Sequence, residues 1–432
     1  MVPDKIKLTV AFDVRRLADS VRYGWHNMGI TRYTKSLYNL LACAGGVNVG
    51  PVIYADTDEP SLFSLDIAAN QVQHALGREI PLAWQKRNVF TFQALKVLSH
   101  IRRGRSIANP LARKLGQFTY EPIPFPSRIR MQWDIYHSPV NALPPPEWTG
   151  NAARVLTVHD CLYLKFPELF PLGTPPIRKA LDSVDVDRDY IICDSDCTRR
   201  DVMSFIPIAE ERTHIIPLAV DALFTNPRGE LAHQLLQSVG VAPGKYVLAL
   251  AQPEPRKNIL RLAKAFHRIR TNPAFSDYVL LLVASGSHLN TISGELQASG
   301  LPKSSFEIVV VIDDETLSGL YGCAALFAYV SSYEGFGIPV LEAMSAGCPV
   351  VVSNTSSLPE VAADAGQYVD PTSVEEIAAG LTRVLGNESV RESMIARGKK
   401  RAKVFSWEKT AAMTLDFYEQ VFESLLTCNK RP

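Results

Sequence analysis

The chain has 432 residues, of which 47% are hydrophobic and 21% are charged, and its formal net charge at pH 7 is +1. This length accommodates two α/β domains with a core each, and the even spread of glycine and proline excludes a disordered or fibrous chain. There is no apolar run of roughly 20 residues to span a membrane, no signal-peptide pattern and no C-x-x-C pair, so we expect a cytoplasmic protein with reduced thiols.

Short β-branched runs alternate with amphipathic segments along the whole chain, which predicts parallel sheets wound with helices. In the first half, strands are expected at 8–12, 49–53, 135–137, 155–159, 190–193 and 214–216. In the second half, they are expected at 246–250, 279–284, 308–312, 326–329 and 350–352. The predicted fold class is therefore α/β, with two doubly wound Rossmann-like domains that face a deep cleft.

The break between the two halves falls between Pro217 and about Gly244, where turn residues interrupt the periodicity around one short helix. We therefore predict an N-terminal domain at 1–217 and a C-terminal domain at 218–406. Residues 407–432 are predicted to form a helix that packs back on the N-terminal domain.

A basic insert departs from this pattern at about 84–130. It holds ten lysine and arginine residues against one acidic residue, a net charge of +9, mixed with apolar side chains. One interpretation is a solvated helical insert. The other is a surface for anionic membrane or a polyprenyl-phosphate acceptor, which would place the protein peripherally on the inner face of the membrane. No nucleic-acid-binding motif accompanies the charge, so we do not expect nucleic acid as a partner.

Two segments of the first half carry candidate contacts to a ligand. Gly29 begins the segment GITRYT, which lies between the first strand and a helix. A single glycine is weak evidence for a binding site, and only its position after the first strand makes it a candidate. The strand at 155–159 ends in His159 and Asp160. A histidine at a strand end is more often structural than catalytic, but this one lies where the N-terminal sheet is expected to face the cleft.

Two adjacent cations follow the first strand of the second half, in the segment EPRKN at 254–258. Such a pair is often a surface feature of a helix start. At the carboxyl end of a strand, however, Arg256 and Lys257 are placed to neutralise the charge of a leaving diphosphate.

The most informative segment, SSYEGFGIPVLEAMSAGCP at 331–349, follows a strand and opens a helix. Pro339 suits the start of that helix, and Gly335 and Gly337 allow a ligand close to the backbone. Amide groups at a helix start form an anion site suited to a diphosphate. Glu334 and Glu342 bracket that site and can accept hydrogen bonds from sugar hydroxyls.

Together these segments resemble the E-x7-E motif and its companions in the retaining GT-B glycosyltransferases of group 1 type (glycosyltransferase family 4), a family that includes many sucrose, glycogen and mannosyl transferases. The resemblance covers most of 6–41 and 153–408 and fades over 60–135. It departs from the family pattern at Thr31, where relatives have a second glycine. It departs again at 250–252, where this chain has Leu-Ala-Gln and many relatives have Gly-Arg or Gly-Thr, so the upstream arginine of those relatives has no counterpart here.

The resemblance implies a role for each matched residue. Glu334 would contact the transferred sugar and Glu342 the ribose, while Lys257, helped by Arg256, would bind the phosphates. His159 would contact the donor sugar near the reacting carbon, and Asp160 would orient it or cap the following turn. Further donor contacts are expected from Gly29 to the diphosphate and from Ile312, in the loop beside the nucleotide base. The glycine loop and the helix start would contribute Phe336, Gly337 and Ile338.

The resemblance also implies the reaction. The C-terminal domain would bind a nucleotide-sugar, and the N-terminal domain would face a glycan or polyprenyl-linked acceptor of bacterial surface polysaccharide or lipopolysaccharide synthesis. The expected enzyme is a retaining, metal-independent hexosyltransferase without a cofactor, with mannose from GDP-mannose as the best candidate and a UDP-hexose close behind. The alternatives are a nucleotide-sugar epimerase, another GT-B enzyme such as a phosphorylase, or a non-catalytic GT-B partner subunit.

Overall fold

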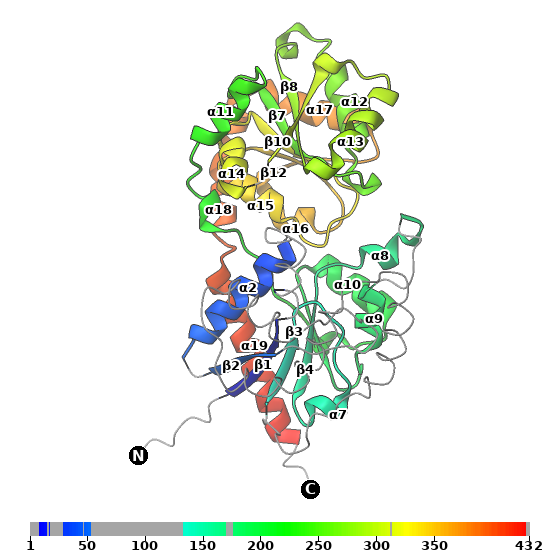
Figure 1. The fold of residues 1–432 in the computed structure, drawn as a ribbon, viewed down its shortest axis with the longest axis vertical. Coiled ribbons are helices and arrows are strands. Elements are labelled where there is room, and N and C mark those ends of the chain that lie inside the picture. The colour runs from blue at the N-terminus through cyan, green and yellow to red at the C-terminus, as the bar shows by residue number, and fades with distance from the viewer. Residues whose placement is uncertain are drawn as a thin grey trace, which may run out of the picture. The chain divides into compact units, whose positions relative to one another are not determined.

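The computed structural model describes residues 8–14, 17, 29–45, 47–52, 133–169, 176–311 and 313–428. The basic segment 84–130 and Ile312 lie outside these residues. The chain forms two compact units (Figure 1): the first contains 1–157, 179–190 and 415–432, and the second contains 158–178 and 191–414. Each unit is built from separate stretches of the chain, so neither corresponds to one continuous domain. The domain boundaries at 217 and 406 stay predictions.

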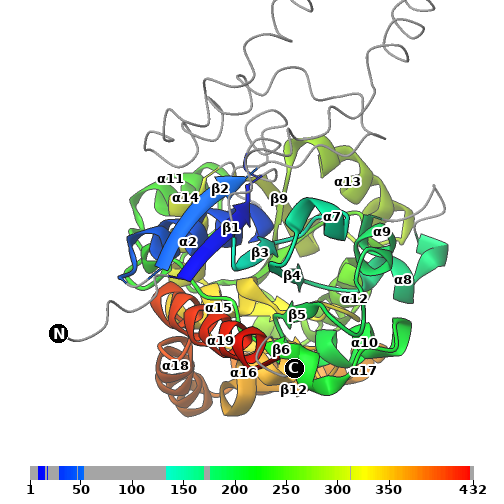
Figure 2. The same ribbon diagram turned by 90° about the horizontal axis from the view of Figure 1, so that it is seen from below.

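The first sheet has six strands in the order β2-β1-β3-β4-β5-β6. Pairing is parallel between β1 and β2, β1 and β3, β3 and β4, and β5 and β6, and Figure 2 shows β2, β1 and β3 side by side. The strands are β1 (Leu8–Asp13), β2 (Val47–Val52), β3 (Ile135–Ser138), β4 (Ala153–Val158), β5 (Tyr190–Cys193) and β6 (Thr213–Ile215).

The second sheet also has six strands, in the order β12-β11-β10-β7-β8-β9, and every pairing in it is parallel. Both sheets thus have the topology of a doubly wound fold, which confirms the predicted α/β class. The strands are β7 (Tyr246–Leu250), β8 (Val279–Ala284), β9 (Phe306–Val310), β10 (Leu326–Tyr329), β11 (Val350–Ser353) and β12 (Gly366–Val369).

Helices connect the strands, as parallel neighbours require. Before β7 they are α2 (Gly29–Cys43), α7 (Pro146–Thr149), α8 (Leu162–Lys165), α9 (Pro176–Asp182), α10 (Asp196–Phe205) and α11 (Glu230–Ser238). After β7 they are α12 (Ile259–Ile269), α13 (Leu289–Ala298), α14 (Asp314–Cys323), α15 (Ile338–Ser345), α16 (Leu358–Ala362), α17 (Val374–Leu385), α18 (Glu388–Ala402) and α19 (Trp407–Cys428). None of the helices within the described ranges is long and apolar enough to cross a membrane.

All eleven predicted strands are present, four of them with the predicted bounds and the others with at least one end shifted by one or two residues. The twelfth, β12, was not predicted, because its sequence Gly-Gln-Tyr-Val carries neither an apolar run nor a clear alternation. The long helix α19 begins at Trp407, whose indole nitrogen donates to Asp221 at 2.7 Å in the second unit. It ends in the first unit, where Tyr418 Oη lies 2.5 Å from His137 Nδ1.

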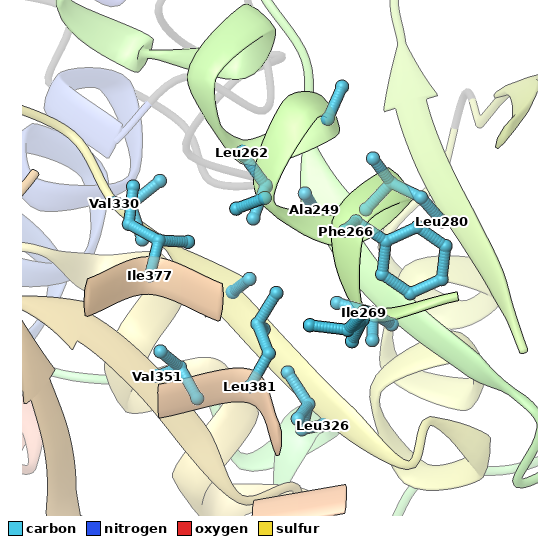
Figure 3. Close-up of a cluster of buried hydrophobic side chains, with 14 of the residues drawn as sticks. Ala249, Leu262, Phe266, Ile269, Leu280, Leu326, Val330, Val351, Ile377 and Leu381 are labelled. Atoms are coloured by element: carbon cyan, nitrogen blue, oxygen red, sulfur yellow. The ribbon is translucent and has the colours of Figure 1, made fainter. Parts of the chain in front are cut away.

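The core of the second unit lies on both faces of its sheet. Alternate residues of β7, β8, β10 and β11 pack under α12 and α17 on one face, where Figure 3 shows Leu262, Phe266 and Leu381 among the buried side chains. On the opposite face, Tyr321 of α14 packs edge-on against Phe327 of β10, with 5.1 Å between ring centroids. Strands buried on both faces explain why these segments are almost continuously apolar.

We expect Leu262→Ala to lower the free energy of unfolding by about 2–5 kcal/mol, because the change removes a buried side chain and leaves a cavity. Leu262 is 1% exposed, whereas Leu260, two residues earlier on α12, is 36% exposed. Leu260→Ala is therefore the matched control, with an expected change within about 0.5 kcal/mol. Denaturant unfolding measures both, and equal losses would contradict this assignment of the core.

Candidate active site

The two cations of the predicted site lie in a tight turn after β7. Residues Pro255–Lys257 form the 3-10 turn η4, and Asn258 ends it in a left-handed conformation with φ of 60°. Asparagine adopts this conformation more readily than most residues. The Asn258 side-chain nitrogen donates to the carbonyl oxygens of Val330 at 3.1 Å and Pro371 at 2.6 Å. Asn258 thereby fixes the turn against the end of β10.

Glu334 accepts hydrogen bonds from both cations. Its Oε1 lies 2.8 Å from Lys257 Nζ and 2.8 Å from Arg256 Nη1, and the three side chains are between 9% and 12% exposed. Arg256 Nε also donates to Glu254 at 2.7 Å, and Lys257 Nζ donates to Tyr329 Oη at 2.8 Å. The result is a nearly buried charge cluster at the carboxyl ends of β7 and β10.

The cluster sets the charge of each member. Burial raises the pKa of Glu334, but the charges of Lys257 and Arg256 outweigh burial and lower that pKa to about 2. Burial lowers the pKa of Arg256, and the charges of Glu334 and Glu254 more than reverse this, so the pKa is raised. Burial, followed by the charge of Glu334, raises the pKa of Tyr329. At neutral pH, Glu334 is therefore an anion that can only accept hydrogen bonds.

Two glycines shape the loop between Glu334 and α15. Gly337 has φ of 119°, and a Cβ there would lie 2.9 Å from Leu358 Cδ2. At Gly335, a Cβ would lie 2.0 Å from the carbonyl oxygen of His159. Glycine at 335 therefore permits the contact between this loop and the end of β4, and glycine at 337 permits the turn into α15.

Side chains from neighbouring loops hold the same segment. Ser357 Oγ donates to the carbonyl oxygens of Glu334 at 2.9 Å and Phe336 at 2.6 Å. Ser195 and Thr198, at the start of α10, donate to the carbonyl oxygen of Gly335 at 2.7 and 3.1 Å. The glycine loop is thus fixed by hydrogen bonds from two directions.

Phe336 and Glu342 are buried in the structure. Phe336 is 6% exposed and packs edge-on against Phe405, with 5.8 Å between ring centroids. Glu342 is 3% exposed and accepts a hydrogen bond of 3.3 Å from Tyr321 Oη. Their contacts with a donor stay predictions, while their packing against the protein is observed.

His159 follows β4 and pairs with an aspartate that the sequence did not indicate. Its Nδ1 lies 2.7 Å from Oδ2 of Asp194, which follows β5. Asp160 does not contact the ring in this way, since its Oδ1 accepts from the backbone nitrogen of Leu162 at 3.0 Å. Of the two roles expected for Asp160, the structure shows the cap of the following turn.

The structure brings four predicted residues of the second unit, His159, Arg256, Lys257 and Glu334, to one place. Gly335 brings the loop of Glu334 against the main chain of His159. Burial raises the pKa of Asp160 overall, while the hydrogen bond from Leu162 and the charges of Arg256 and His159 oppose part of that rise. Gly337 and Ile338 begin α15 beside them. Gly29 begins α2 in the first unit, where it is partly buried. Ile312 lies outside the described residues, so its predicted contact is not placed.

Two residues of the site, Tyr329 and Asp194, had no signal in the sequence, and Asn258 lay in the predicted segment at 254–258 without a role of its own. Each acts through contacts with segments that are distant in the chain, and such contacts leave no local pattern. No cluster of three or more histidine, cysteine, aspartate or glutamate side chains suits a metal ion in the described part of the chain. Metal independence stays a prediction.

Comparison with known proteins places the chain in a family. Residues 237–401 match the family model described as "Glycosyl transferases group 1". The chain is also 33% identical over 290 residues to the O-antigen chain mannosyltransferase B of Escherichia coli, a match that covers 66% of this chain and 74% of the relative. The chain belongs to the group 1 glycosyl transferases. The cation turn and the glycine loop of this group 1 transferase both lie inside the matched region, whereas His159 and Asp194 precede it.

Other relatives agree with this assignment. The group 1 transferase is 28% identical over 240 residues to the MMP alpha-(1->4)-mannosyltransferase of Mycolicibacterium hassiacum, and the match covers 54% of each chain. Among solved structures, the sucrose-phosphate synthase (tll1590) of Thermosynechococcus elongatus superposes with a TM-score of 0.61 at 20% identity, over 96% of this chain and 100% of the other. This likeness shows the shared GT-B fold.

We expect Glu334→Gln to lower the free energy of unfolding by about 3 kcal/mol at pH 7, since each pKa unit corresponds to 1.36 kcal/mol. The pKa of Glu334 is lowered from 4.5 to about 2 in the folded chain. Its stabilising effect is therefore complete above about pH 4.5 and is lost as the pH falls toward 2. Denaturant unfolding at a series of pH values measures the difference between the two proteins.

The control for this prediction is Glu375→Gln, which breaks an ion pair with Arg268 whose side chains are 66% and 60% exposed. Exposed pairs contribute about 0–1 kcal/mol, so this variant is expected to change little. The difference in the free energy of unfolding between the unmodified protein and Glu334→Gln should become smaller at low pH. A difference that stays constant would contradict the proposed charge cluster.

Proposed function

We propose that this chain is a retaining hexosyltransferase that moves mannose from GDP-mannose to a glycan or lipid-linked glycan acceptor of a bacterial surface polysaccharide. The observation that carries the proposal is the cluster of Lys257, Arg256 and Glu334 beside the start of α15 and His159. It combines fixed positive charge, a helix start and an ionised carboxylate within one nearly buried site.

The charges give the donor one orientation. Glu334 repels phosphate but accepts hydrogen bonds from sugar hydroxyls, whereas Arg256 and Lys257 donate to phosphate oxygens. The diphosphate therefore belongs on the side of the cations and of the amides at Gly337 and Ile338, at the start of α15. The hexose belongs on the side of Glu334 and His159.

The proposed reaction is leaving-group departure stabilised by fixed charge. As the bond between the anomeric carbon and the diphosphate breaks, negative charge develops on the phosphate oxygens, where Lys257 and Arg256 donate. One such preorganised donor contributes about 2.7–4 kcal/mol to transition-state stabilisation. We propose that these cations act without a metal ion and that the enzyme takes no cofactor besides its donor substrate.

We propose retention because the resemblance to the group 1 family implies it, and we propose a route without a covalent intermediate because Glu334 is a poor nucleophile. Its carboxylate is bound by two cations, and its low pKa reflects their stabilisation of the anion. Attack by the acceptor hydroxyl from the same face as the departing diphosphate, with the hydroxyl proton passing to a leaving phosphate oxygen, gives retention without a covalent intermediate on the protein.

The choice of mannose follows from the relatives, two of which carry the name mannosyltransferase. The name of the first also motivates a surface-polysaccharide acceptor. We further propose that the basic segment 84–130 makes a peripheral contact with the inner face of the membrane, where a lipid-linked acceptor would lie, and that the cytoplasm is the site of action.

We expect GDP-mannose to stabilise the protein more than UDP-, dTDP- and ADP-sugars do in a thermal-shift panel. At a concentration of 100 times Kd, binding stabilises the folded state by about 2.7 kcal/mol. Lys257→Ala is expected to weaken this binding about tenfold to a hundredfold, through the loss of a charge-assisted hydrogen bond. The matched control is Lys264→Ala on the exposed face of α12, which should bind the donor normally.

If Lys257→Ala and Lys264→Ala bind the nucleotide-sugar equally well, Lys257 does not bind the diphosphate. If none of the nucleotide-sugars binds, the proposed transferase function fails and the non-catalytic interpretation gains support.

We expect hydrolysis of GDP-α-mannose in the absence of acceptor to release α-mannose first. Proton NMR of the anomeric signal, recorded before the free sugar equilibrates, distinguishes the two anomers. Initial release of β-mannose would exclude the proposed retention. Conversion of the donor to another nucleotide-sugar without release of free sugar would identify an epimerase instead.

A further inference from the structure

Asp194 is a buried carboxylate at the junction between β5 and α10. It is 1% exposed, and its Oδ2 lies 2.7 Å from Nδ1 of His159, whose side chain is 10% exposed. The other oxygen, Oδ1, is buried and has no hydrogen-bond partner. Burial raises the pKa of this carboxyl, and the charge and hydrogen bond of His159 lower it.

The junction that carries Asp194 is held on several sides. Ser195 caps α10 by accepting from the backbone nitrogen of Thr198 at 3.1 Å. The carboxylate of Glu360, on α16, accepts from the backbone nitrogens of Asp196 at 2.7 Å and Cys197 at 2.8 Å. The main chain beside Asp194 is therefore fixed independently of the bond to His159.

This arrangement is unfavourable for a purely structural link. A buried carboxylate with an unpaired oxygen carries a desolvation penalty, and a neutral side chain would join β4 to β5 with a smaller one. What a carboxylate adds is chemical, because an ionised carboxylate only accepts hydrogen bonds. It requires a proton on the imidazole nitrogen that faces it.

We propose that Asp194 is a positioning residue that holds the proton of His159 on Nδ1 and aims Nε2 at the donor sugar. The proposal deepens the proposed function and rests on it. With the proton fixed on Nδ1, the neutral ring presents the lone pair of Nε2, which accepts a hydrogen bond from a hydroxyl of the transferred hexose. The main chain of His159 lies against the loop that carries Glu334, since a Cβ at Gly335 would be 2.0 Å from the His159 carbonyl oxygen.

The test compares Asp194→Asn with the matched control Asp196→Asn in the full-length protein. Asp196 lies two residues away, but its side chain is 37% exposed and pairs with Arg199 at 2.7 Å. Nitrogen-15 NMR of the histidine rings reports which nitrogen of His159 carries the proton, and the signal is assigned with His159→Gln. The measurement needs no donor. Thermal unfolding confirms that both variants are folded, and Asp194→Glu is the second variant if Asp194→Asn does not fold.

We expect His159 to carry a proton on Nδ1 in the unmodified protein and in Asp196→Asn, and to lose this preference in Asp194→Asn. We also expect the kcat for hydrolysis of GDP-mannose to fall about tenfold to a hundredfold in Asp194→Asn, by analogy with the loss of groups that orient metal-binding histidines. The KM should change less than kcat. If Asp194→Glu is used, the carboxylate is present but displaced, so the Nδ1 proton should remain while kcat falls.

Two results would overturn the proposal. One is an unchanged protonation pattern of His159 in Asp194→Asn, which would show that the carboxylate does not set it. The other is a changed pattern with undiminished kcat, which would show that the orientation of the ring does not matter to the reaction. Failure of the unmodified protein to hydrolyse any donor would instead refute the proposed function, and the NMR spectrum would still report whether Asp194 controls the ring.

Discussion

The site depends on one carboxylate that neutralises two cations in a place almost closed to water. Arg256 and Lys257 are each about one-tenth exposed, and two unpaired cations at that depth would be strongly destabilising. Glu334 makes their burial tolerable, and in return the cations keep it ionised. The same balance suits the proposed binding of a diphosphate. In that proposal the incoming anion would take over part of the positive charge, and Glu334 would become available to sugar hydroxyls without becoming neutral.

Glycine 335 is the point where this charge cluster meets the histidine. Any side chain at that position would collide with the carbonyl oxygen of His159, so the approach of the two segments depends on a missing Cβ. Ser195 and Thr198 then bind the Gly335 carbonyl. The charge cluster and His159 are thus held together through the main chain at residue 335, whose position varies less than that of long polar side chains.

The sequence predicted the sheets and the main site residues because these leave local patterns. Continuous apolar runs mark strands covered on both faces, and the glycines and proline around Glu334 mark a loop that opens a helix. Strand β12 escaped prediction because Gly366 and Gln367 break any such pattern, and its place in the sheet comes from pairing with β11. Asp194 and Tyr329 escaped for a related reason. Their importance lies in partners 35 and 72 residues away, and nothing beside them in the sequence announces those partners.

The hydrogen bonds of Asn258 bear on when the site assembles. Its side chain bridges the end of β10 to the carbonyl oxygen of Pro371, 113 residues further along the chain. A nascent or partly folded chain that has not yet placed Pro371 already contains Arg256, Lys257 and Glu334, but it lacks the link that holds the cation turn in position. If the cation turn binds phosphate as proposed, that binding depends on Pro371 being in place. A fragment that ends before residue 371 would contain Arg256, Lys257 and Glu334 but would lack the hydrogen bond from Asn258 to Pro371 that holds the cation turn.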